Sequence, residues 1–293
     1  MEEKPLVSIL MTAYNREQYI GEAIASVLAI DYSNYELIIV DDGSKDKTAP
    51  IIEAWLEKDR RIRFYQNEQN LGDYPNRNKA ANYACGKYLV YVDSDDRMFA
   101  NALSKFVEAM ETHACSFGIF SHTSNPEPFK LEPADIIPTH FYKKPVLNFG
   151  PVATIIKNDY FKSIKGFPVK YGPANDMYYN LKAASKTNTL VFPFPLVDYR
   201  VHEGQELNNK YSYLVNNFRY LNDALDELNL PLKGNEKLYL RHKNKRRFVV
   251  NVFKFLFKTA NLNKAILAIK LSGFSWRDFP DAIITKPSPK KSI

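Results

Sequence analysis

Three carboxylates within four residues, in the segment Asp93-Ser94-Asp95-Asp96, are the strongest chemical signal in the sequence. Carboxylates this close repel one another, and a nearby cation is needed to keep all of them ionised. A hard divalent cation such as Mg²⁺ or Mn²⁺ meets that need, because it binds one or two carboxylates together with phosphate oxygens. A solvated turn at the start of a helix also favours Asp. On this segment alone, metal binding and helix capping are equally supported.

Two further polar segments have residue types suited to ligand binding. Asp41-Asp42-Gly43-Ser44 is acidic, although Asp is also common before a Gly turn. Thr12-Ala13-Tyr14-Asn15 contains a ring that could flank a nucleotide base and backbone groups that could hydrogen-bond it. Each of these residues is also an ordinary loop residue. Their value as a signal therefore depends on whether the fold brings the segments together.

Each of the three polar segments follows a run of apolar residues that predicts a buried strand, at residues 6–11, 36–40 and 88–92. Between these runs, apolar residues at helical spacing predict amphipathic helices. Strands that alternate with such helices are typical of a parallel sheet covered on both faces. Because ligands bind beyond the carboxyl ends of these strands, we expect both acidic segments at one edge of the sheet.

The pattern becomes looser beyond residue 117. Five prolines between residues 126 and 145 predict a loop-rich surface or lid region. Short strands are expected at 154–156, 190–192 and 197–201, with a helix from Asp176 to Ala184. After Gln205 the sequence predicts helices with basic faces. We therefore expect one domain over residues 1–204 and a helical basic region over residues 205–293.

Composition excludes several classes of protein. The 293 residues are 45% hydrophobic and carry a formal charge of +7, an excess that prescribes no partner. Two cysteines are too few for a disulfide framework or a cysteine-based zinc site. Neither common glycine-rich phosphate loop is present. With no basic and apolar leader and no apolar run of membrane-spanning length, we expect a soluble, cytoplasmic α/β protein.

Taken in order, the motifs resemble family 2 inverting glycosyltransferases of the GT-A fold. The matching pieces are P-L-V-S-I-L-M-T-A-Y-N, I-I-V-D-D-G-S-K-D-K-T, N-x-G followed by R-N, Y-V-D-S-D-D, Asn175-Asp176 and Tyr199-Arg200-Val201-His202. They cover residues 5–204, which would form the catalytic domain. The resemblance implies an α/β, Rossmann-like fold with a mostly parallel sheet flanked by helices, followed by the helical C-terminal extension.

The resemblance also implies an activity. Such an enzyme moves a sugar from a nucleoside diphosphate donor, usually a UDP-sugar, with Mn²⁺ or Mg²⁺ as cofactor. The acceptor would be a hydroxyl of a glycan or a lipid-linked saccharide in bacterial cell-surface polysaccharide synthesis. A catalytically inactive GT-A-like module that binds nucleotide or sugar is the alternative. A sugar-nucleotidyltransferase is less favoured, because its expected glycine-rich, basic phosphate loop is missing near the N-terminus.

Roles transfer from the family residue by residue. Asp42 resembles the carboxylate that hydrogen-bonds the base, and Asp93 resembles the first Asp of the D-x-D motif, near the ribose. Asp95 resembles the second Asp, a metal ligand, and Asp96 would assist through water. His202 matches a position that faces the diphosphate or the metal. The other implied nucleotide-binding residues are Thr12, Ala13, Tyr14, Asn15, Arg77, Asn78 and Ser94. From its residue type alone, Arg77 is equally suited to pairing with an aspartate at the sheet edge.

Inversion at the anomeric carbon requires a general base. The acceptor hydroxyl displaces the diphosphate in one step, and a carboxylate must accept its proton. By resemblance this base is Asp176, in the pair Asn175-Asp176, where the family commonly has Glu before the Asp. The alternative role for Asp176 is capping of the helix that starts there.

The C-terminal region alternates basic and apolar residues over positions 239–272. Such a segment can lie on an anionic membrane surface, and family 2 enzymes often use lipid-linked acceptors. A helical subdomain with a solvated basic face is slightly favoured over this peripheral membrane contact at the inner face. Nucleic-acid binding is not expected, because no recognised module accompanies the charge.

Overall fold

The computed structural model describes residues 4–202 and 210–283. Contacts divide the chain into two units, the first formed by Met1–Phe167 and Lys186–Val201. The second is formed by Pro168–Ser185 and His202–Ile293. This division groups a segment before residue 204 with the C-terminal helices, so the domain boundary expected at 204/205 stays a prediction.

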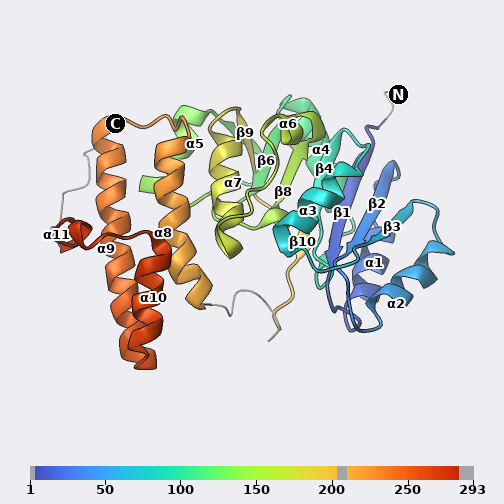
Figure 1. Ribbon diagram of the computed structural model, residues 1–293. Coiled ribbons are helices and arrows are strands. Elements are labelled where there is room, and N and C mark those ends of the chain that lie inside the picture. The colour runs from blue at the N-terminus through green and yellow to red at the C-terminus, as the bar shows by residue number, and fades with distance from the viewer. Residues whose placement is uncertain (1–3, 203–209, 284–293) are drawn as a thin grey trace. The chain divides into compact units, whose positions relative to one another are not determined.

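An eight-stranded sheet is the framework of the first unit, with strand order β3-β2-β1-β4-β8-β6-β9-β7. Strands β3, β2, β1 and β4 are parallel and lie side by side (Figure 1). Only β8 and β7 run antiparallel to their neighbours, which confirms a mostly parallel sheet. The strands are β1 (Val7–Ala13), β2 (Tyr35–Asp41), β3 (Ile62–Gln66), β4 (Tyr88–Tyr91), β6 (Phe117–Phe120), β7 (Phe129–Leu131), β8 (Thr154–Lys157) and β9 (Thr189–Phe192). A separate antiparallel pair joins β5 (Arg97–Met98) and β10 (Val197–Asp198).

Helices cover both faces of the sheet. The inward side chains of α1 (Ile20–Leu28), α2 (Thr48–Leu56) and α4 (Ala102–Thr112) share one apolar cluster with alternate strand residues. α3 (Asp73–Asn82) contacts β1 and β2, and its buried side chains lie outside that cluster, so it covers the opposite face. Because β1 has apolar neighbours on both faces, nearly all of its side chains are buried.

The region expected to be a loop-rich lid is more regular than predicted. Between residues 117 and 201 it contains α5 (Pro133–Tyr142), η1 (Pro151–Ala153) and α6 (Asn158–Ser163) in addition to four strands of the sheet, β6, β7, β8 and β9. Pro133 fits the start of α5 because a residue there has no helical partner for its N–H. Proline therefore marks a helix start here rather than a loop. The strand expected at 197–201 is also shorter, because β10 ends at Asp198.

The second unit is helical, as expected for the C-terminal extension. Its elements are η2 (Gly172–Ala174), α7 (Asn175–Ala184), α8 (Lys210–Glu227), α9 (Gly234–Thr259), α10 (Leu262–Ser272), η4 (Trp276–Asp278) and α11 (Phe279–Ile283). The rings of Phe218, Phe248 and Phe274 pack together at the centre of α8, α9 and the segment after α10. In the described residues, no helix has the length and apolar character required to cross a membrane.

Glu36 joins the strands that carry the candidate site. Its carboxylate accepts hydrogen bonds from Ser8 Oγ (2.6 Å), the Cys85 N–H (2.7 Å) and Arg63 Nη1 (2.8 Å). Burial opposes ionisation of Glu36, but these three donors together hold its pKa below the ordinary value. The charged form of Glu36 therefore stabilises the packing of β1, β2 and β3 against one another.

Glu36→Gln is expected to lower the free energy of unfolding by about 1.5–3 kcal/mol at pH 7, the usual cost of losing hydrogen bonds to a charged group. Because the folded pKa of Glu36 is lowered, its contribution is complete above the unfolded pKa. It is lost as the pH falls through the lower, folded value. Urea unfolding followed by circular dichroism should thus show a difference between wild type and variant that is constant from pH 7 to pH 5 and shrinks in stronger acid. The exposed Glu108, changed to Gln, should have little effect, and equal losses in both variants would contradict this role of Glu36.

Candidate nucleotide and metal site

The carboxyl ends of β2, β1 and β4 meet at one edge of the sheet. In the parallel pairing Ala13 at the end of β1 lies opposite Asp41 at the end of β2, and β4 pairs with the other side of β1. The segments that follow these strands therefore share that edge, as the sequence predicts. The shared edge brings both acidic segments and the segment 12–15 into one neighbourhood.

Asp93, Asp95 and Asp96 form a compact carboxylate cluster. One carboxylate oxygen from each lies within 4.8 Å of the others, and within the described parts of the chain no other group of His, Cys, Asp and Glu is this dense. A turn holds the cluster, because the Asp96 N–H donates to the Asp93 carbonyl (2.9 Å). Asp96 Oδ1 accepts the Arg200 N–H (3.0 Å), whereas its buried Oδ2 has no hydrogen-bond partner among the described residues.

Burial shapes the electrostatics of this cluster. It raises the pKa of Asp96 to about 7, and the neighbouring Asp93 carboxylate adds to the effect. Burial also raises the pKa of Asp93, although the Arg77 guanidinium opposes the shift. Carboxylates that resist ionisation in this way, with one oxygen left without a partner, fit a hard divalent cation that would compensate their charge. Asp93, Asp95 and Asp96 are thus the residues that could hold such a metal.

Two arginines to which the sequence motifs assigned no role, Arg16 and Arg200, are bound to the cluster. Arg16 Nε lies 3.1 Å from Asp95 Oδ2, and the Arg16 N–H donates to Thr48 Oγ1 (2.7 Å). Arg200 Nε donates to the Asp95 carbonyl, and its Nη1 donates to Glu22 Oε2 (2.7 Å). Arg16 directly follows the segment 12–15. Its position just after the end of a predicted strand could have indicated that it belongs to the site.

Arg77 pairs with aspartates at the sheet edge, the second of its two expected roles. Its Nε donates to Asp73 Oδ1 (2.7 Å), and its Nη2 lies 2.7 Å from Asp93 Oδ1. Burial opposes the charge, but the Asp73 and Asp93 carboxylates hold the pKa of Arg77 well above its ordinary value. The guanidinium also lies over the rings of Tyr74 and Tyr91. Arg77 therefore fixes Asp93 in place, and direct contact with phosphate stays a prediction.

Asp42 is buried and bonded to the segment that contains the N-x-G motif. It accepts hydrogen bonds from Asn67 Nδ2 (2.7 Å) and the Leu71 N–H (2.9 Å) at Oδ1, and from the Gly72 N–H (2.9 Å) at Oδ2. A carboxylate oxygen accepts two hydrogen bonds, so Oδ2 retains one position for the N–H of a ligand. Asn67, which follows the end of β3, is a further residue that the motif analysis missed.

The segment 12–15 is fastened to the segment after β2. The Asn15 N–H donates to Ser44 Oγ (2.8 Å), and Asn15 Oδ1 accepts the Lys45 N–H (2.8 Å). Asn15 has a φ of 52°, a left-handed conformation that Asn tolerates better than most residues. Tyr14 is 43% exposed beside this turn. Thr12 and Ala13 are the last residues of β1. A wall of a base pocket at this place stays a prediction.

Asn78 and Ser94 lie in different settings. Asn78 Nδ2 donates to the Phe167 carbonyl (2.9 Å), and Asn78 Oδ1 accepts the Phe167 N–H (2.9 Å). Both polar groups of the Asn78 amide are therefore engaged with backbone, which gives this side chain a structural function. Ser94 is buried between Asp93 and Asp95. Nucleotide contacts of Asn78 and Ser94 stay predictions.

The remaining two predicted residues belong to the second unit. Asp176 lies in the first turn of α7, where its Oδ1 accepts the Met177 N–H (2.7 Å). The preceding Asn175 is buried, and its amide bonds the Tyr171 N–H and the Gly172 carbonyl. Asn175 thus builds the turn before α7, which leaves Asp176 partly exposed. His202 follows Val201 outside any helix or strand. Roles for Asp176 as base and His202 as metal ligand stay predictions.

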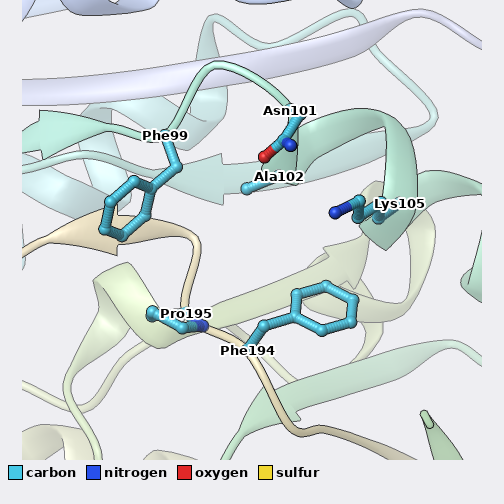
Figure 2. Close-up of a pocket in the computed structure, with 6 residues that line it drawn as sticks. All are labelled: Phe99, Asn101, Ala102, Lys105, Phe194 and Pro195. Carbon is cyan, nitrogen blue, oxygen red and sulfur yellow. The ribbon is translucent and has the colours of Figure 1, made fainter. Parts of the chain in front are cut away.

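A small pocket of the first unit contains none of these residues. Phe99, Ala102, Lys105 and Phe194 are among its lining residues, and Figure 2 shows Ala102 and Lys105 across from Pro195 and Phe194. Its volume of about 200 Å³ is below the ~300–1,000 Å³ of typical ligand pockets. We assign no function to it.

Comparison with known proteins identifies the family. The sequence profile described as Glycosyl transferase family 2 matches residues 8–162, which include β2, β4, the carboxylate cluster and all of β1 except its first residue. The chain belongs to this family. The resemblance drawn from the ordered motifs is thereby confirmed.

Two curated glycosyltransferases are similar to part of the chain. TuaG of Bacillus subtilis, named for teichuronic acid biosynthesis, is 38% identical over 41% of this chain and 48% of its own length. WfgD of Escherichia coli, named a UDP-Glc:α-D-GlcNAc-diphosphoundecaprenol β-1,3-glucosyltransferase, is 40% identical over 38% of this chain and 44% of its own length. The chain thus aligns with less than half the length of these two relatives.

Solved structures show that the glycosyltransferase fold extends over most of the chain. TarS of S. aureus, residues 1–349 in complex with UDP, matches with a TM-score of 0.70 and 20% identity, covering 94% of this chain and 80% of that one. A TarS structure in complex with UDP-GlcNAc matches with a TM-score of 0.66. At this identity the likeness concerns the fold, and it confirms the expected GT-A architecture with its helical C-terminal region.

Proposed function

We propose that the protein is a metal-dependent inverting glycosyltransferase that moves a sugar from a nucleoside diphosphate donor to a hydroxyl of a glycan or lipid-linked acceptor. The observation that carries the proposal is the cluster of Asp93, Asp95 and Asp96 at the carboxyl end of β4. An inactive binding domain has no need to keep three mutually repelling carboxylates within 4.8 Å of one another. Their retention favours an enzyme that handles a charged donor.

The donor would bind along the edge formed by the ends of β1, β2 and β4. Asp42 would accept the N–H of the base at Oδ2, beside the segment 12–15. Asp93, held by Arg77, would face the ribose, and Asp95 with His202 would hold Mn²⁺ or Mg²⁺. When bound, the cation supplies positive charge that stabilises the departing diphosphate. UDP is the nucleotide we favour, because TarS, which shares the fold, binds UDP and UDP-GlcNAc.

The chemistry would be a single displacement. A bond forms between the acceptor oxygen and the anomeric carbon while the bond from that carbon to the diphosphate oxygen breaks on the opposite side. Asp176 would accept the proton of the acceptor hydroxyl. Its partial exposure and its place in the first turn of α7 leave the carboxylate accessible to an acceptor. The N-terminus of α7 favours negative charge, which suits a carboxylate at this position.

The acceptor we propose is a lipid-linked saccharide in bacterial cell-surface polysaccharide synthesis. WfgD is named for transfer to a diphosphoundecaprenol-linked sugar, and TuaG is named for teichuronic acid biosynthesis. Both names describe those proteins, and they indicate the class of acceptor to test first.

A transfer assay tests this proposal. The protein, Mn²⁺ and a panel of UDP-sugars are incubated with a short-chain lipid diphosphate-linked GlcNAc, and the products are examined by mass spectrometry and proton NMR. One donor is expected to give a product whose anomeric configuration is opposite to that of the donor. Retained configuration would contradict the single displacement. Nucleotide binding without transfer from any donor would favour the inactive binding module.

Arg16 offers a prediction about the metal site. Its guanidinium lies 3.1 Å from Asp95 Oδ2, so it competes with a cation for that carboxylate. Arg16→Gln is expected to raise the affinity for Mn²⁺ alone by about five- to tenfold, since the repulsion removed is on the order of 1 kcal/mol. The affinity can be measured by electron paramagnetic resonance, which reports the concentration of free Mn²⁺. Arg61→Gln breaks a similar ion pair with Asp59 elsewhere and is the matched control. Unchanged or weaker binding in Arg16→Gln would contradict the assignment.

A further inference from the structure

The C-terminal helices contain a long stretch without acidic residues. From Lys237 to Arg277 the sequence has eleven Lys and Arg residues and no Asp or Glu. Acids from flanking segments engage some of them: Arg241 pairs with Asp226, and Lys245 lies 2.8 Å from Asp278 Oδ1. Others, such as Lys254, are exposed. The surface of this helical region therefore has a strong local excess of positive charge.

Apolar side chains are exposed within the same stretch. On α9, Val250, Phe253 and Phe257 follow one another at spacings of three and four residues, so they lie on one face of the helix. All three are exposed, and Phe257 is 88% exposed. On the other side of the helix, Phe248 and Val252 are buried in the core of the unit. The exposed apolar face is thus separate from the buried face that stabilises the fold.

α10 repeats this arrangement. Ala265, Ala268 and Ser272 form its buried face. Leu262, Ile266, Leu267 and Leu271 are all exposed at between 44% and 58%. A helix of a soluble domain normally presents polar residues on the face away from the core. This exposed face is instead mostly apolar, with Lys264 and Lys270 beside it.

The turn between α9 and α10 brings the two apolar faces to one end of a helical hairpin. The helices contact each other, and Figure 1 shows them side by side. Ala260 turns the chain in a left-handed conformation (φ 50°), so Phe257 and Leu262 both flank the turn. We call residues 253–267 the hairpin tip. It combines exposed Phe, Leu and Ile side chains with Lys254, Lys258 and Lys264.

We propose that the hairpin tip docks on the surface of an anionic lipid bilayer. Apolar side chains would enter the boundary between headgroups and acyl chains, and the lysines would contact lipid phosphates, as amphipathic basic helices do. A second copy of the chain fits less well, because it would place two surfaces of the same charge against each other. A nucleic acid would use the lysines and leave the apolar side chains exposed. This inference goes beyond sugar transfer and stands without it.

Vesicle co-sedimentation tests the proposal on the full chain. Wild-type protein is expected to bind vesicles of phosphatidylcholine with 30% phosphatidylglycerol much more strongly than vesicles of phosphatidylcholine alone. Lys254→Gln with Lys258→Gln should weaken binding to the anionic vesicles by about 25-fold, since each such charge near the surface contributes about fivefold. Phe257→Ser with Leu262→Ser should weaken it by about 100-fold, since burial of each side chain contributes about tenfold.

Matched controls separate this surface from general charge and general apolarity. Lys143→Gln with Lys144→Gln removes two exposed lysines from the first unit. Leu238→Ser removes an exposed leucine near the other end of α9. Both controls should bind vesicles as the wild type does. Because the changed side chains are exposed, circular dichroism and nucleotide binding should be the same in all variants, so failure of sugar transfer would leave the vesicle result interpretable.

Three results would overturn the proposal. Equal binding to neutral and anionic vesicles would show that the lysines do not contribute. Wild-type binding by the variant with Phe257→Ser and Leu262→Ser would show that the hairpin tip does not contact the bilayer. Absence of vesicle binding, together with self-association of the wild type in sedimentation velocity that the tip variants lose, would assign the surface to a second copy of the chain.

Discussion

Asp176→Asn is expected to lower the rate of sugar transfer by about 100- to 10,000-fold, the range for loss of a general base, with nucleotide affinity nearly unchanged. Asn has almost the same shape and retains a side-chain oxygen that can accept the Met177 N–H, as Asp176 does at 2.7 Å. The variant therefore removes the proton acceptor while it keeps the start of α7. Initial rates of UDP release in the presence of acceptor, with UDP affinity measured by calorimetry, separate the two effects.

The chain offers a close control for this variant. Asp159 follows Asn158 at the start of α6, as Asp176 follows Asn175 at the start of α7, and its Oδ1 accepts the Tyr160 N–H (2.6 Å). Asp159→Asn therefore makes the same change from Asp to Asn at a helix start without removing the proposed base. Wild-type rates in Asp176→Asn, or equal losses in both variants, would contradict the role of Asp176.

Asp95→Asn is expected to lower the affinity for Mn²⁺ by more than about 100-fold, because loss of even an outer-shell partner costs 10–100-fold. UDP binding should fall with it and lose its dependence on metal. The physical reason is that Asp95 supplies a charged oxygen within the cluster of three carboxylates. Titration of UDP with and without Mn²⁺ measures both effects.

Asp59→Asn is the control for Asp95→Asn. Asp59 is also an aspartate paired with an arginine, Arg61, at 2.6 Å, but it lies outside the cluster. It should retain wild-type affinity for Mn²⁺ and UDP. Metal-dependent UDP binding that survives in Asp95→Asn would exclude this residue as a ligand.

The sheet edge was predictable because it depends on local patterns. Buried strands read as continuous apolar runs, and polar residues that follow them mark the carboxyl ends, as at Ala13, Asp41 and Tyr91. Parallel pairing then brings those ends together without any further information. Both acidic segments were placed at one edge by this reasoning, and the pairing of β1 with β2 and β4 confirms it.

The partners of the site residues were harder to predict, because they depend on contacts between distant segments. Arg16 reaches Asp95 across 79 positions of the sequence, and Asn78 bonds the backbone of Phe167 across 89 positions. No local sequence pattern predicts either contact. Asn67 is similar, since its role depends on Asp42 being buried beside it. Residue types and motifs were therefore sufficient to locate the site. The hydrogen bonds within it could be identified only from the three-dimensional structure.

Proline accounts for the main error in the predicted elements. The sequence criterion treats it as a breaker of regular structure, but Pro133 occupies the first turn of α5, where its fixed φ and missing N–H are compatible with a helix. Pro138 lies inside the same helix, which shows that contacts can offset the loss of one hydrogen bond.

The central claim is that the edge formed by β1, β2 and β4 binds a nucleoside diphosphate together with a divalent metal. Calorimetric titration of UDP, GDP, dTDP and CDP, each with Mn²⁺ and with a chelator, tests it most directly. Strong binding of UDP that the chelator abolishes is the predicted result. Failure of the folded protein to bind any of the four nucleotides, or binding that the chelator leaves unchanged, would contradict the claim.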